Sequence, residues 1–507
     1  MLQGRTSRRQ LLAGLASGGV ALALGVRPRT AIASTQGPRK TLAAEIKHGG
    51  REFAQGLLLG ARLQSGVLAG PGAFESVVVV SPLPFTHVGV HWLASDINVG
   101  FDVRTSTDGT TWTPWKKVHA ESFPDETHDG ETYGALVGAL RHSYLQYRAN
   151  LGTGATLSRV TATFLNTVDG PALQTSSLAI CTSPSAKPVD YTREQWGADE
   201  SIRSGTPAYL PAKRLILHHT VSSSDFAGNL TGAIGDVQAI YYYHAVTQGW
   251  GDIAYHYLID GDGNVFEGRR GRAASSSDDA GCGREVASEG VRGTHTAYHN
   301  DETTSVAALG NYEPGYLETL QPRDALIAAI IQVAAFECSR QQFDPLLSGY
   351  HLRTDDFWSA GLPDITYHGQ CSGNNTACCG QNLITKVDPI RLAVNSAINR
   401  SGPAVQLTSG PDGVTVTNGR ASFAWMGSGW SGSASYEVCL VGFSVVKRTY
   451  DIKPLAGLSN GLRVWTAVGE ATSRTLEGLA AGHYTFHVRP VGGRYAVSRT
   501  FLAKGKR

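Results

Sequence analysis

Hydrophobic and polar positions alternate along the first part of the chain, and the alternation repeats in several short segments. Residues 143–151 (SYLQYRANL) and 157–165 (LSRVTATFL) place an apolar side chain at almost every second position, which is typical of β-strands that bury one face. Residues 97–106 are rich in β-branched and aromatic residues and lead into a turn, STDGT, at 106–110. We therefore predict an antiparallel β-sandwich over residues 41–168.

The pattern changes from a period of two to a helical period near residue 191. Apolar residues recur at helical spacing over 234–244 and again over 326–337. A short apolar run at 213–217 predicts a buried strand. The Asp-Pro pair that opens 388–398 is typical of an N-cap followed by a proline in the first turn of a helix. These alternating elements predict a mixed α/β domain over residues 191–401.

Alternation returns in the last hundred residues. Segments such as GLRVWTAV and HYTFHVRPV are separated by Gly-rich turns, and they predict a fibronectin- or immunoglobulin-like β-sandwich over residues 402–507. Residues 169–190 are rich in Ser, Thr, Ala and Pro and read as a linker. The predicted fold is therefore multidomain: a central α/β domain, with a mixed sheet and helices, flanked by N-terminal and C-terminal antiparallel β-sandwich domains.

Residues 1–33 read as an export signal. Arg8 and Arg9 precede a short apolar run at 11–24, and small residues at 31–33 suit a signal peptidase. The segment SRRQLL resembles the twin-arginine signal that bacteria use to export folded proteins. We expect a mature protein in the periplasm, in the cell wall or outside the cell; the alternative is that the segment stays as an anchor.

Charge and hydropathy narrow the class of partner. The chain has 44 Lys and Arg against 42 Asp and Glu, a net charge of +2. A protein with so little net charge is not expected to bind nucleic acid or another acidic polymer through its overall charge. After the signal, no segment is long and apolar enough to predict a membrane span.

Seven cysteines are present, and an odd number leaves at least one thiol unpaired or bound to a metal. Export places them in a compartment where disulfides persist. Four of the seven lie between Cys338 and Cys379. Cys181 is a candidate for a disulfide that pins the linker, and Cys282 for one with Cys371 or Cys338.

Three side chains of metal-binding type lie in the central region. His218 ends the apolar strand, His368 follows the short run 364–367, and Cys378 lies ten residues further on. Each alone would be read as a structural histidine or half of a disulfide. Together they form the donor set that zinc prefers, because catalytic zinc sites usually have three nitrogen, sulfur or oxygen ligands and one open position.

Four motifs carry a resemblance to a known family. They are REQWGAD (193–199), LILHHT (215–220), QGWGDIAYHYLIDGDGNVFEGR (248–269) and YHGQCSGNNTACCG (367–380). The region from Arg193 to Ile398 resembles peptidoglycan recognition proteins and type-2 N-acetylmuramoyl-L-alanine amidases. The third motif is the most specific of the four.

The resemblance implies an activity and a set of residues. His218, His368 and Cys378 would bind Zn²⁺, Tyr255 would be the catalytic tyrosine, and Thr376 would help to polarise the substrate carbonyl. The substrate would be peptidoglycan, cut between N-acetylmuramic acid and L-alanine. The interval between the second His and the Cys is two residues longer than usual in the family.

Four alternatives stay open at this stage. Cys379, which stands where the family usually has proline, competes with Cys378 as the ligand. The domain could bind peptidoglycan without cutting it, or serve a structural or adhesive surface protein. A zinc peptidase is a weaker possibility because no H-E-x-x-H motif is present.

Further side chains near these motifs have two readings each. His219 and His256 could contact the zinc ligands or simply pack in the core. Glu267 and Arg269 could shape the substrate groove or form surface pairs. His295 is not expected to be a ligand. Residues 273–291 and 351–362 are expected to be long loops beside the groove.

Overall fold

The computed structural model describes residues 38–95, 98–121, 130–173, 187–273, 285, 289–315, 319–355, 357–398, 403–445, 452–454, 465–491 and 496–504. The predicted export signal at 1–33 and the cysteines Cys181 and Cys282 lie outside these ranges. Within them, no helix has the length and apolar character needed to cross a membrane.

The N-terminal region is built from antiparallel strands that hydrogen bonds join into one 12-stranded network. The long strand β6 lies between β11 and β12, and the buried rings of Trp92, Phe101 and Phe164 contribute to its core. The antiparallel strands agree with the alternation in the sequence, while their division into two facing sheets stays a prediction. The elements are β1 (Leu42–His48), α2 (Gly50–Phe53), β2 (Leu57–Leu59), β3 (Arg62–Gln64), β4 (Val67–Ala69), β5 (Gly72–Glu75), β6 (Val79–Ala94), β7 (Val99–Ser106), β8 (Lys116–Val118), β9 (Ala120–Glu121), β10 (Thr132–Gly134), β11 (Val137–Leu151) and β12 (Thr156–Asn166).

The central region has a five-stranded mixed sheet in the order β16-β15-β18-β14-β21. Strands β14, β15, β18 and β21 run parallel to one another, and the edge strand β16 pairs with β15 in the antiparallel sense. The strands are β14 (Arg214–His219), β15 (Tyr257–Ile259), β16 (Val265–Glu267), β18 (Thr303–Ala308) and β21 (Ile365–Tyr367), with two-residue strands β13 (Tyr209–Leu210) and β17 (Gly290–Val291) paired beside them.

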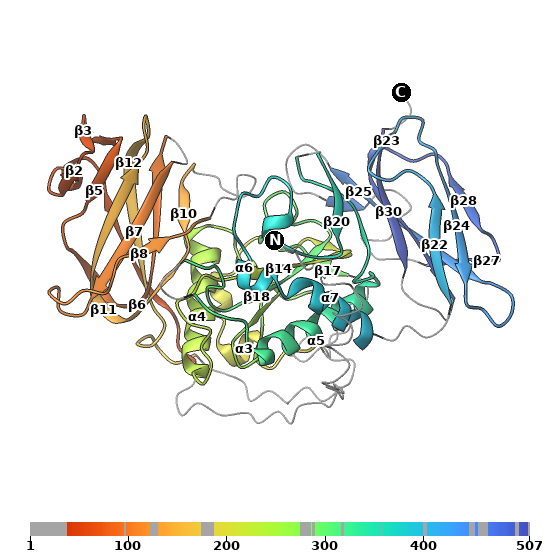
Figure 1. Ribbon diagram of the computed structural model, residues 1–507, viewed down its shortest axis with the longest axis horizontal. Helices are drawn as coiled ribbons and strands as arrows, with labels where there is room; N and C mark the ends of the chain where they lie inside the picture. Colours follow the sequence, from red (N-terminus) through yellow and green to blue (C-terminus); the bar gives the residue numbers. More distant parts are fainter. Residues whose placement is uncertain are drawn as a thin grey trace, which may run out of the picture. The chain divides into compact units, whose positions relative to one another are not determined.

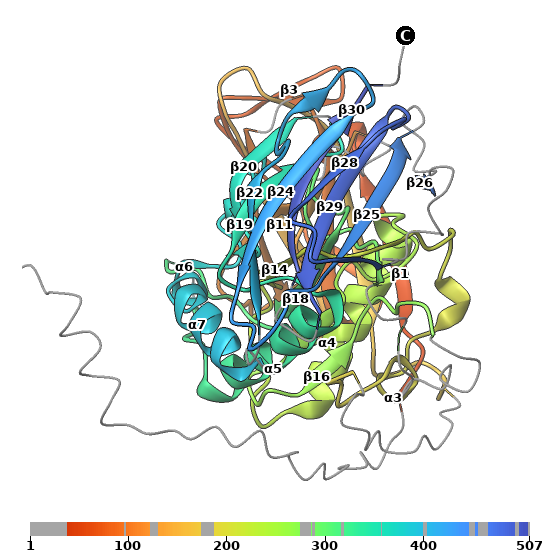
Figure 2. The same ribbon diagram turned by 90° about the vertical axis from the view of Figure 1, so that its right-hand side faces the viewer.

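Helices cover both faces of this sheet, as expected where parallel strands are buried on both sides. Leu215 and Leu217 of β14 pack in one core with α5 and α7, whereas Leu258 of β15 packs in a second core with α4. Figures 1 and 2 both show α5 and α7 side by side. The predicted α/β fold of the central region is therefore confirmed. In the described residues the helices are α3 (Arg193–Trp196), α4 (Leu230–Tyr242), α5 (Asp324–Gln341), α6 (Gln381–Ile384) and α7 (Val387–Ala397), together with the π-helical turn η2 (Tyr243–Thr247) and the 3₁₀ turns η1 (Glu200–Ile202) and η4 (His368–Gln370).

Two predictions about local structure need correction. The third helix begins at Val387, so Asp388 lies in its first turn and not at the N-cap; α6 leads into it through a two-residue turn, and a side-chain cap is not needed. The predicted loop at 351–362 contributes to an antiparallel hairpin, β19 (Ser348–Leu352) paired with β20 (Trp358–Pro363).

The C-terminal region consists of two sheets around a common apolar core. One sheet has the order β22-β24-β28, and the other contains β23, β25, β26, β27, β29 and β30. Phe423 of the first sheet stacks on Phe486 of the second with ring centroids 4.0 Å apart. The fibronectin- or immunoglobulin-like type stays a prediction. The strands are β22 (Ala404–Ser409), β23 (Thr415–Val416), β24 (Ala421–Ser428), β25 (Tyr436–Val445), β26 (Ile452–Pro454), β27 (Thr466–Gly469), β28 (Ser473–Leu476), β29 (Gly482–Pro490) and β30 (Val497–Ala503).

A buried ion pair lies where the central region meets the C-terminal strands. The Lys213 ammonium lies 2.8 Å from the Glu302 carboxylate, and it also donates to the Thr500 hydroxyl. The Thr485 hydroxyl donates to the same carboxylate. Burial raises the pKa of Glu302, but the charges of Lys213 and His483 and the hydrogen bonds from Lys213 and Thr485 together lower it to about 2.

We expect the Glu302→Gln substitution to destabilise the protein by about 3 kcal/mol, because it leaves a buried lysine without its counter-charge. The pKa of Glu302 is about 2 in the folded protein, against an ordinary pKa of 4.5. Its contribution is therefore present above pH 4.5 and is lost as pH falls toward 2. Thermal unfolding across this pH range measures both effects. The matched Glu437→Gln variant removes the more exposed pair with Arg489 and should cost less than about 1 kcal/mol; equal losses would contradict the account.

Candidate metal centre

Two of the predicted ligands lie at the same edge of the central sheet. His218 is the second-last residue of strand β14, and His368 directly follows β21. Because β14 and β21 are parallel neighbours, their carboxyl ends meet, which is where α/β sheets place their sites. Cys378 approaches from the segment before α6. The ligand atoms of the three residues all lie within 4.8 Å of one another, and all three residues are buried.

His218 is oriented by contacts on both of its ring nitrogens. Its Nδ1 lies 3.6 Å from the Cys378 sulfur. Its Nε2 lies 3.1 Å from Nδ1 of His295 and 3.3 Å from the Thr296 hydroxyl. His295 therefore stands behind the first ligand and not in the cluster, in agreement with the expectation that it is not a ligand. Such partners fix the ring orientation and the tautomer of a metal-binding histidine.

His368 is oriented by Asn374, which the sequence reasoning missed. The Nε2 atom of His368 lies 3.0 Å from the Asn374 side-chain oxygen. The Asn374 amide nitrogen donates to the Ala297 and Cys371 carbonyl oxygens. Because one ring nitrogen faces Asn374, the other is the nitrogen that a metal would take. Asn374 lies between His368 and Cys378, in the interval that is longer than usual in the family. That extra length was the only feature of the sequence that could have pointed to its role.

We expect Asn374→Ala to weaken zinc binding about 10- to 100-fold, the usual cost of removing a partner that orients a ligand. Competition with a chromophoric chelator measures the affinity. Asn375→Ala is the matched control, because Asn375 is an exposed neighbour and should leave the affinity unchanged. Equal affinities of the two variants would show that Asn374 does not orient His368.

The geometry distinguishes the two adjacent cysteines. The Cys378 sulfur accepts a hydrogen bond from the His219 backbone N–H at 3.4 Å and faces His218. Cys379 is fully buried in the apolar core of the α5 and α7 face, and burial raises the pKa of its thiol. Among the described residues, only Cys378 contributes a sulfur to the cluster.

Burial keeps both histidines of the cluster neutral. It is the largest cause that lowers the pKa of His218 well below its ordinary value, with His368 as the next cause. Burial likewise lowers the pKa of His368 to about 4, against the hydrogen bond to the Asn374 side-chain oxygen, which raises it. Since a metal binds neutral imidazole, both rings are in the ligand form at neutral pH.

Tyr255 lies beside the cluster, in the segment that enters strand β15. Its ring centroid is 5.3 Å from that of His218 and 5.6 Å from that of His244. Its backbone carbonyl accepts a hydrogen bond from the Arg269 N–H. The side chain is 8% exposed, so the ring is fixed while part of its surface reaches solvent.

Thr376 is exposed and lies two residues before Cys378. Its hydroxyl oxygen accepts a hydrogen bond from the Cys378 N–H at 3.2 Å. The hydroxyl proton can still be donated, because a hydroxyl is both a donor and an acceptor. The structure thus brings all five predicted site residues into one neighbourhood: three in the cluster, one beside the first ligand and one beside the third.

The other candidates near the motifs have structural contacts. His219 accepts a hydrogen bond from the Tyr312 N–H, and His256 bonds to Ser305 and to the Val291 carbonyl. The Arg269 guanidinium donates to three backbone carbonyls, and the buried Glu267 carboxylate pairs with Arg270 and Lys187.

The sequence profile of the N-acetylmuramoyl-L-alanine amidase family matches residues 208–381. Peptidoglycan-recognition protein SC2 of Drosophila melanogaster is 26% identical over 196 residues, which cover 39% of this chain and 83% of that protein. The N-acetylmuramoyl-L-alanine amidase of Homo sapiens is 30% identical over 125 residues, which cover 25% of this chain and 19% of the human protein. The solved structure of Drosophila PGRP-LB matches with 19% identity, a TM-score of 0.28 and coverage of 39% of this chain and 91% of that chain.

These matches and the site define a class. The central region of this chain belongs to the family of peptidoglycan recognition proteins and type-2 N-acetylmuramoyl-L-alanine amidases. The matched segment of the human amidase is about a fifth of that protein's length, so the activity of the whole protein is treated below as a proposal.

Proposed function

We propose that this chain is an exported, zinc-dependent N-acetylmuramoyl-L-alanine amidase that hydrolyses the bond between N-acetylmuramic acid and L-alanine in peptidoglycan. The observation that carries the proposal is the buried cluster of His218, His368 and Cys378. The proposed organisation is a twin-arginine-type signal (1–33), a β-sandwich (41–168), a linker (169–190), the amidase domain (191–401) and a second sandwich (402–507).

The cluster suits zinc by the chemistry of its donors. Two neutral imidazoles and one thiolate are typical zinc ligands, and three protein ligands leave the open position that a catalytic site needs. The close spacing of the three ligand atoms fits a single ion. When bound, zinc would supply Lewis acidity and lower the pKa of a coordinated water.

We assign Tyr255 and Thr376, which lie beside His218 and Cys378, to the scissile amide. A phenol donates a hydrogen bond, and the Tyr255 ring packs against His218. We assign its hydroxyl to the amide oxygen, where negative charge develops during hydrolysis. Thr376 would donate a second hydrogen bond to the same oxygen from beside Cys378. Thr376 is the weaker partner, because a hydroxyl carries no charge and the side chain is exposed.

The alternative is a protein of the same fold that binds peptidoglycan without cutting it. It is favoured by the longer interval between His368 and Cys378, and relatives named for recognition and for amidase activity are both similar to the chain. Release of stem peptides from purified cell walls distinguishes the two. An amidase releases them, stops when a chelator removes zinc and resumes when zinc is restored, whereas a binding protein sediments with the walls and releases nothing.

A further inference from the structure

The π turn η2 ends helix α4 and packs directly beside Tyr255. A hydrogen bond from the Gln248 N–H to the Tyr243 carbonyl closes this turn at 2.8 Å, and it spans one residue more than the bonds of an α-helix. Such turns are rare overall, and many of them lie at functional sites. The second residue of the turn, His244, is buried, and its contacts lead to the proposed mechanism.

His244 holds both ends of the loop of residues 250–255, which delivers Tyr255. At the start of the loop, the His244 carbonyl accepts a hydrogen bond from the Trp250 N–H at 3.0 Å, and the two rings lie 4.9 Å apart. At the end of the loop, Nδ1 of His244 accepts a hydrogen bond from the Ala254 N–H at 3.2 Å. The His244 ring also meets the Tyr255 ring edge to face, with centroids 5.6 Å apart.

Burial keeps His244 in the chemical form that these contacts require. It is the largest cause that lowers the pKa of His244 to about 3, and the charge of Arg269 is the next cause. The ring is therefore neutral at neutral pH, so one nitrogen accepts a hydrogen bond while the other carries the proton. Because Nδ1 accepts from Ala254, the proton is on Nε2.

Tyr255 is held through its ring and through its backbone. Its ring lies between those of His218 and His244, with centroids 5.3 and 5.6 Å away. On one side of its backbone the Ala254 N–H is bonded to His244, and on the other the Tyr255 carbonyl accepts from the Arg269 N–H at 2.7 Å. This control matters, because a displacement of about 1 Å at a reacting centre can cost about 10²-fold in rate.

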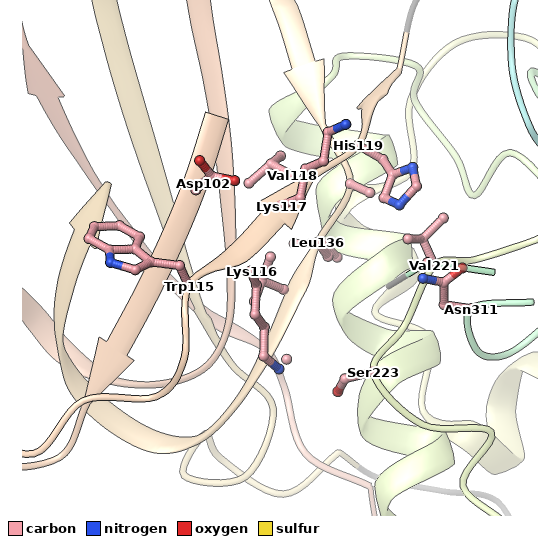
Figure 3. A pocket seen from close by; sticks show the side chains of 14 residues that line it. Asp102, Trp115, Lys116, Lys117, Val118, His119, Leu136, Val221, Ser223 and Asn311 are labelled. Atoms are coloured by element: carbon pink, nitrogen blue, oxygen red, sulfur yellow. The ribbon is translucent and has the colours of Figure 1, made fainter. Parts of the chain in front are cut away.

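The N-terminal strands contact the π turn through Tyr243, the neighbour of His244. The Tyr243 hydroxyl donates to a carbonyl at the end of strand β10 at 2.9 Å, and a Cβ built on Gly89 would lie 2.3 Å from the Tyr243 ring. Leu136 packs against the same cluster. It also lines the cavity of about 360 Å³ between strand β8 and the segment after β14, shown in Figure 3. The close packing around Tyr243 limits the movement of the turn that carries His244.

We propose that His244 is a positioning residue for Tyr255, which holds the loop of residues 250–255 so that the tyrosine hydroxyl meets the amide oxygen of the substrate. The inference rests on the proposed function, because it takes Tyr255 as a donor to that oxygen. His244 acts only through Tyr255 and is not a member of the metal-binding cluster.

The test separates the two contacts of the His244 side chain. His244→Phe keeps a ring beside Tyr255 but cannot accept the Ala254 N–H, whereas the side-chain oxygen of His244→Asn can accept it. We expect His244→Phe to lower kcat on a soluble muropeptide about tenfold with KM and zinc content unchanged, because a displaced donor weakens only the transition-state contact. A His244→Phe enzyme with the kcat of the wild type would overturn the proposal.

His244→Asn is the conservative variant. Its kcat should stay within about threefold of the wild type, because only an aromatic contact is lost. A larger loss of kcat in folded, zinc-loaded His244→Asn would overturn the proposal, even if His244→Phe does not fold.

Combination with Tyr255→Phe distinguishes positioning from a general loss of packing. Once the Tyr255 hydroxyl is absent its position no longer matters, so adding His244→Phe should lower kcat by less than about twofold. Tyr241→Phe is the matched background, because it removes a hydroxyl that bonds to the Asp199 carbonyl and keeps that of Tyr255. The full loss should remain there. Equal losses in the two backgrounds would show that His244 acts through stability, and would overturn the proposal.

Hydrogen exchange tests the same contact without turnover. The bond to His244 protects the Ala254 N–H, so exchange in a peptide that covers residues 250–255 should be about tenfold faster in His244→Phe but not in His244→Asn. Equal exchange in the wild type and His244→Phe would overturn the inference. A wild type that releases no stem peptide would instead overturn the proposed function, and the exchange rates would still decide whether His244 holds the loop.

Discussion

His218→Ala is expected to abolish stoichiometric zinc binding and to lower amidase activity on the order of 10³-fold. The substitution removes one of three protein ligands, and the imidazole it deletes also faces the Cys378 sulfur at 3.6 Å. Since a catalytic metal supplies several kcal/mol of transition-state stabilisation and each 1.36 kcal/mol is tenfold in rate, a loss of about 4 kcal/mol gives this magnitude. Elemental analysis of the purified variant and peptide release from cell walls measure the two effects.

The control for this variant must also remove a buried histidine. His299 suits it, because it is fully buried in the same region and bonds to Ser359 at 2.7 Å without belonging to the cluster. His299→Ala should lower the thermal unfolding midpoint but leave the zinc content unchanged. If His218→Ala retained zinc and normal activity, the assigned metal centre would be wrong.

Tyr255→Phe is expected to keep zinc and to lower kcat about 10²- to 10³-fold, the usual cost of losing one hydrogen bond to a developing oxyanion. Phenylalanine preserves the ring that packs 5.3 Å from the His218 ring, so the ligand geometry should be retained. The measurement is kcat and KM on a soluble muropeptide, together with zinc content.

Tyr241→Phe is the matched control. It removes the hydroxyl of another buried tyrosine, which donates to the Asp199 carbonyl and is not part of the ligand cluster. Its kcat should equal that of the wild type. A Tyr255→Phe enzyme with undiminished kcat would remove the tyrosine from the mechanism without affecting the metal assignment.

The sequence predicted the central fold and the cluster because both leave local signals. A run of apolar residues that ends at His218 indicates a buried strand with a ligand at its end, and the motif containing Tyr255 is long enough to be specific. Helix α4 was found by its spacing, although its start at Leu230 depends on capping by the Asn229 side chain, which accepts a hydrogen bond from Gly232.

Other features could not be predicted, because they depend on contacts between residues far apart in the chain. Asn374 orients His368 only because the longer interval folds back on it. The hairpin of β19 and β20 arises from pairing of two segments that looked like one loop. The cavity exists only where strand β8 meets the segments after β14, and no motif in either segment predicts the other.

The choice between Cys378 and Cys379 illustrates the same limit. The resemblance favours Cys378, because the flanking Ala377 and Gly380 fix the register, although the spacing from His368 is longer than usual for either cysteine. Their difference is tertiary: the Cys378 sulfur lies 3.6 Å from Nδ1 of His218 and belongs to the cluster, while Cys379 is fully buried and is not among the described cluster residues. Residue type and spacing alone do not place a sulfur beside His218. The contact between the Cys378 sulfur and His218 forms only in the folded protein.

The most direct test of the central claim is mass spectrometry of the products that the zinc-loaded protein makes from a defined disaccharide-peptide fragment. The account predicts two products, a disaccharide with a free lactyl carboxylate and a peptide with a free L-alanine amine, formed only when zinc is bound. An intact fragment, or cleavage at a glycosidic or peptide bond instead, would contradict it.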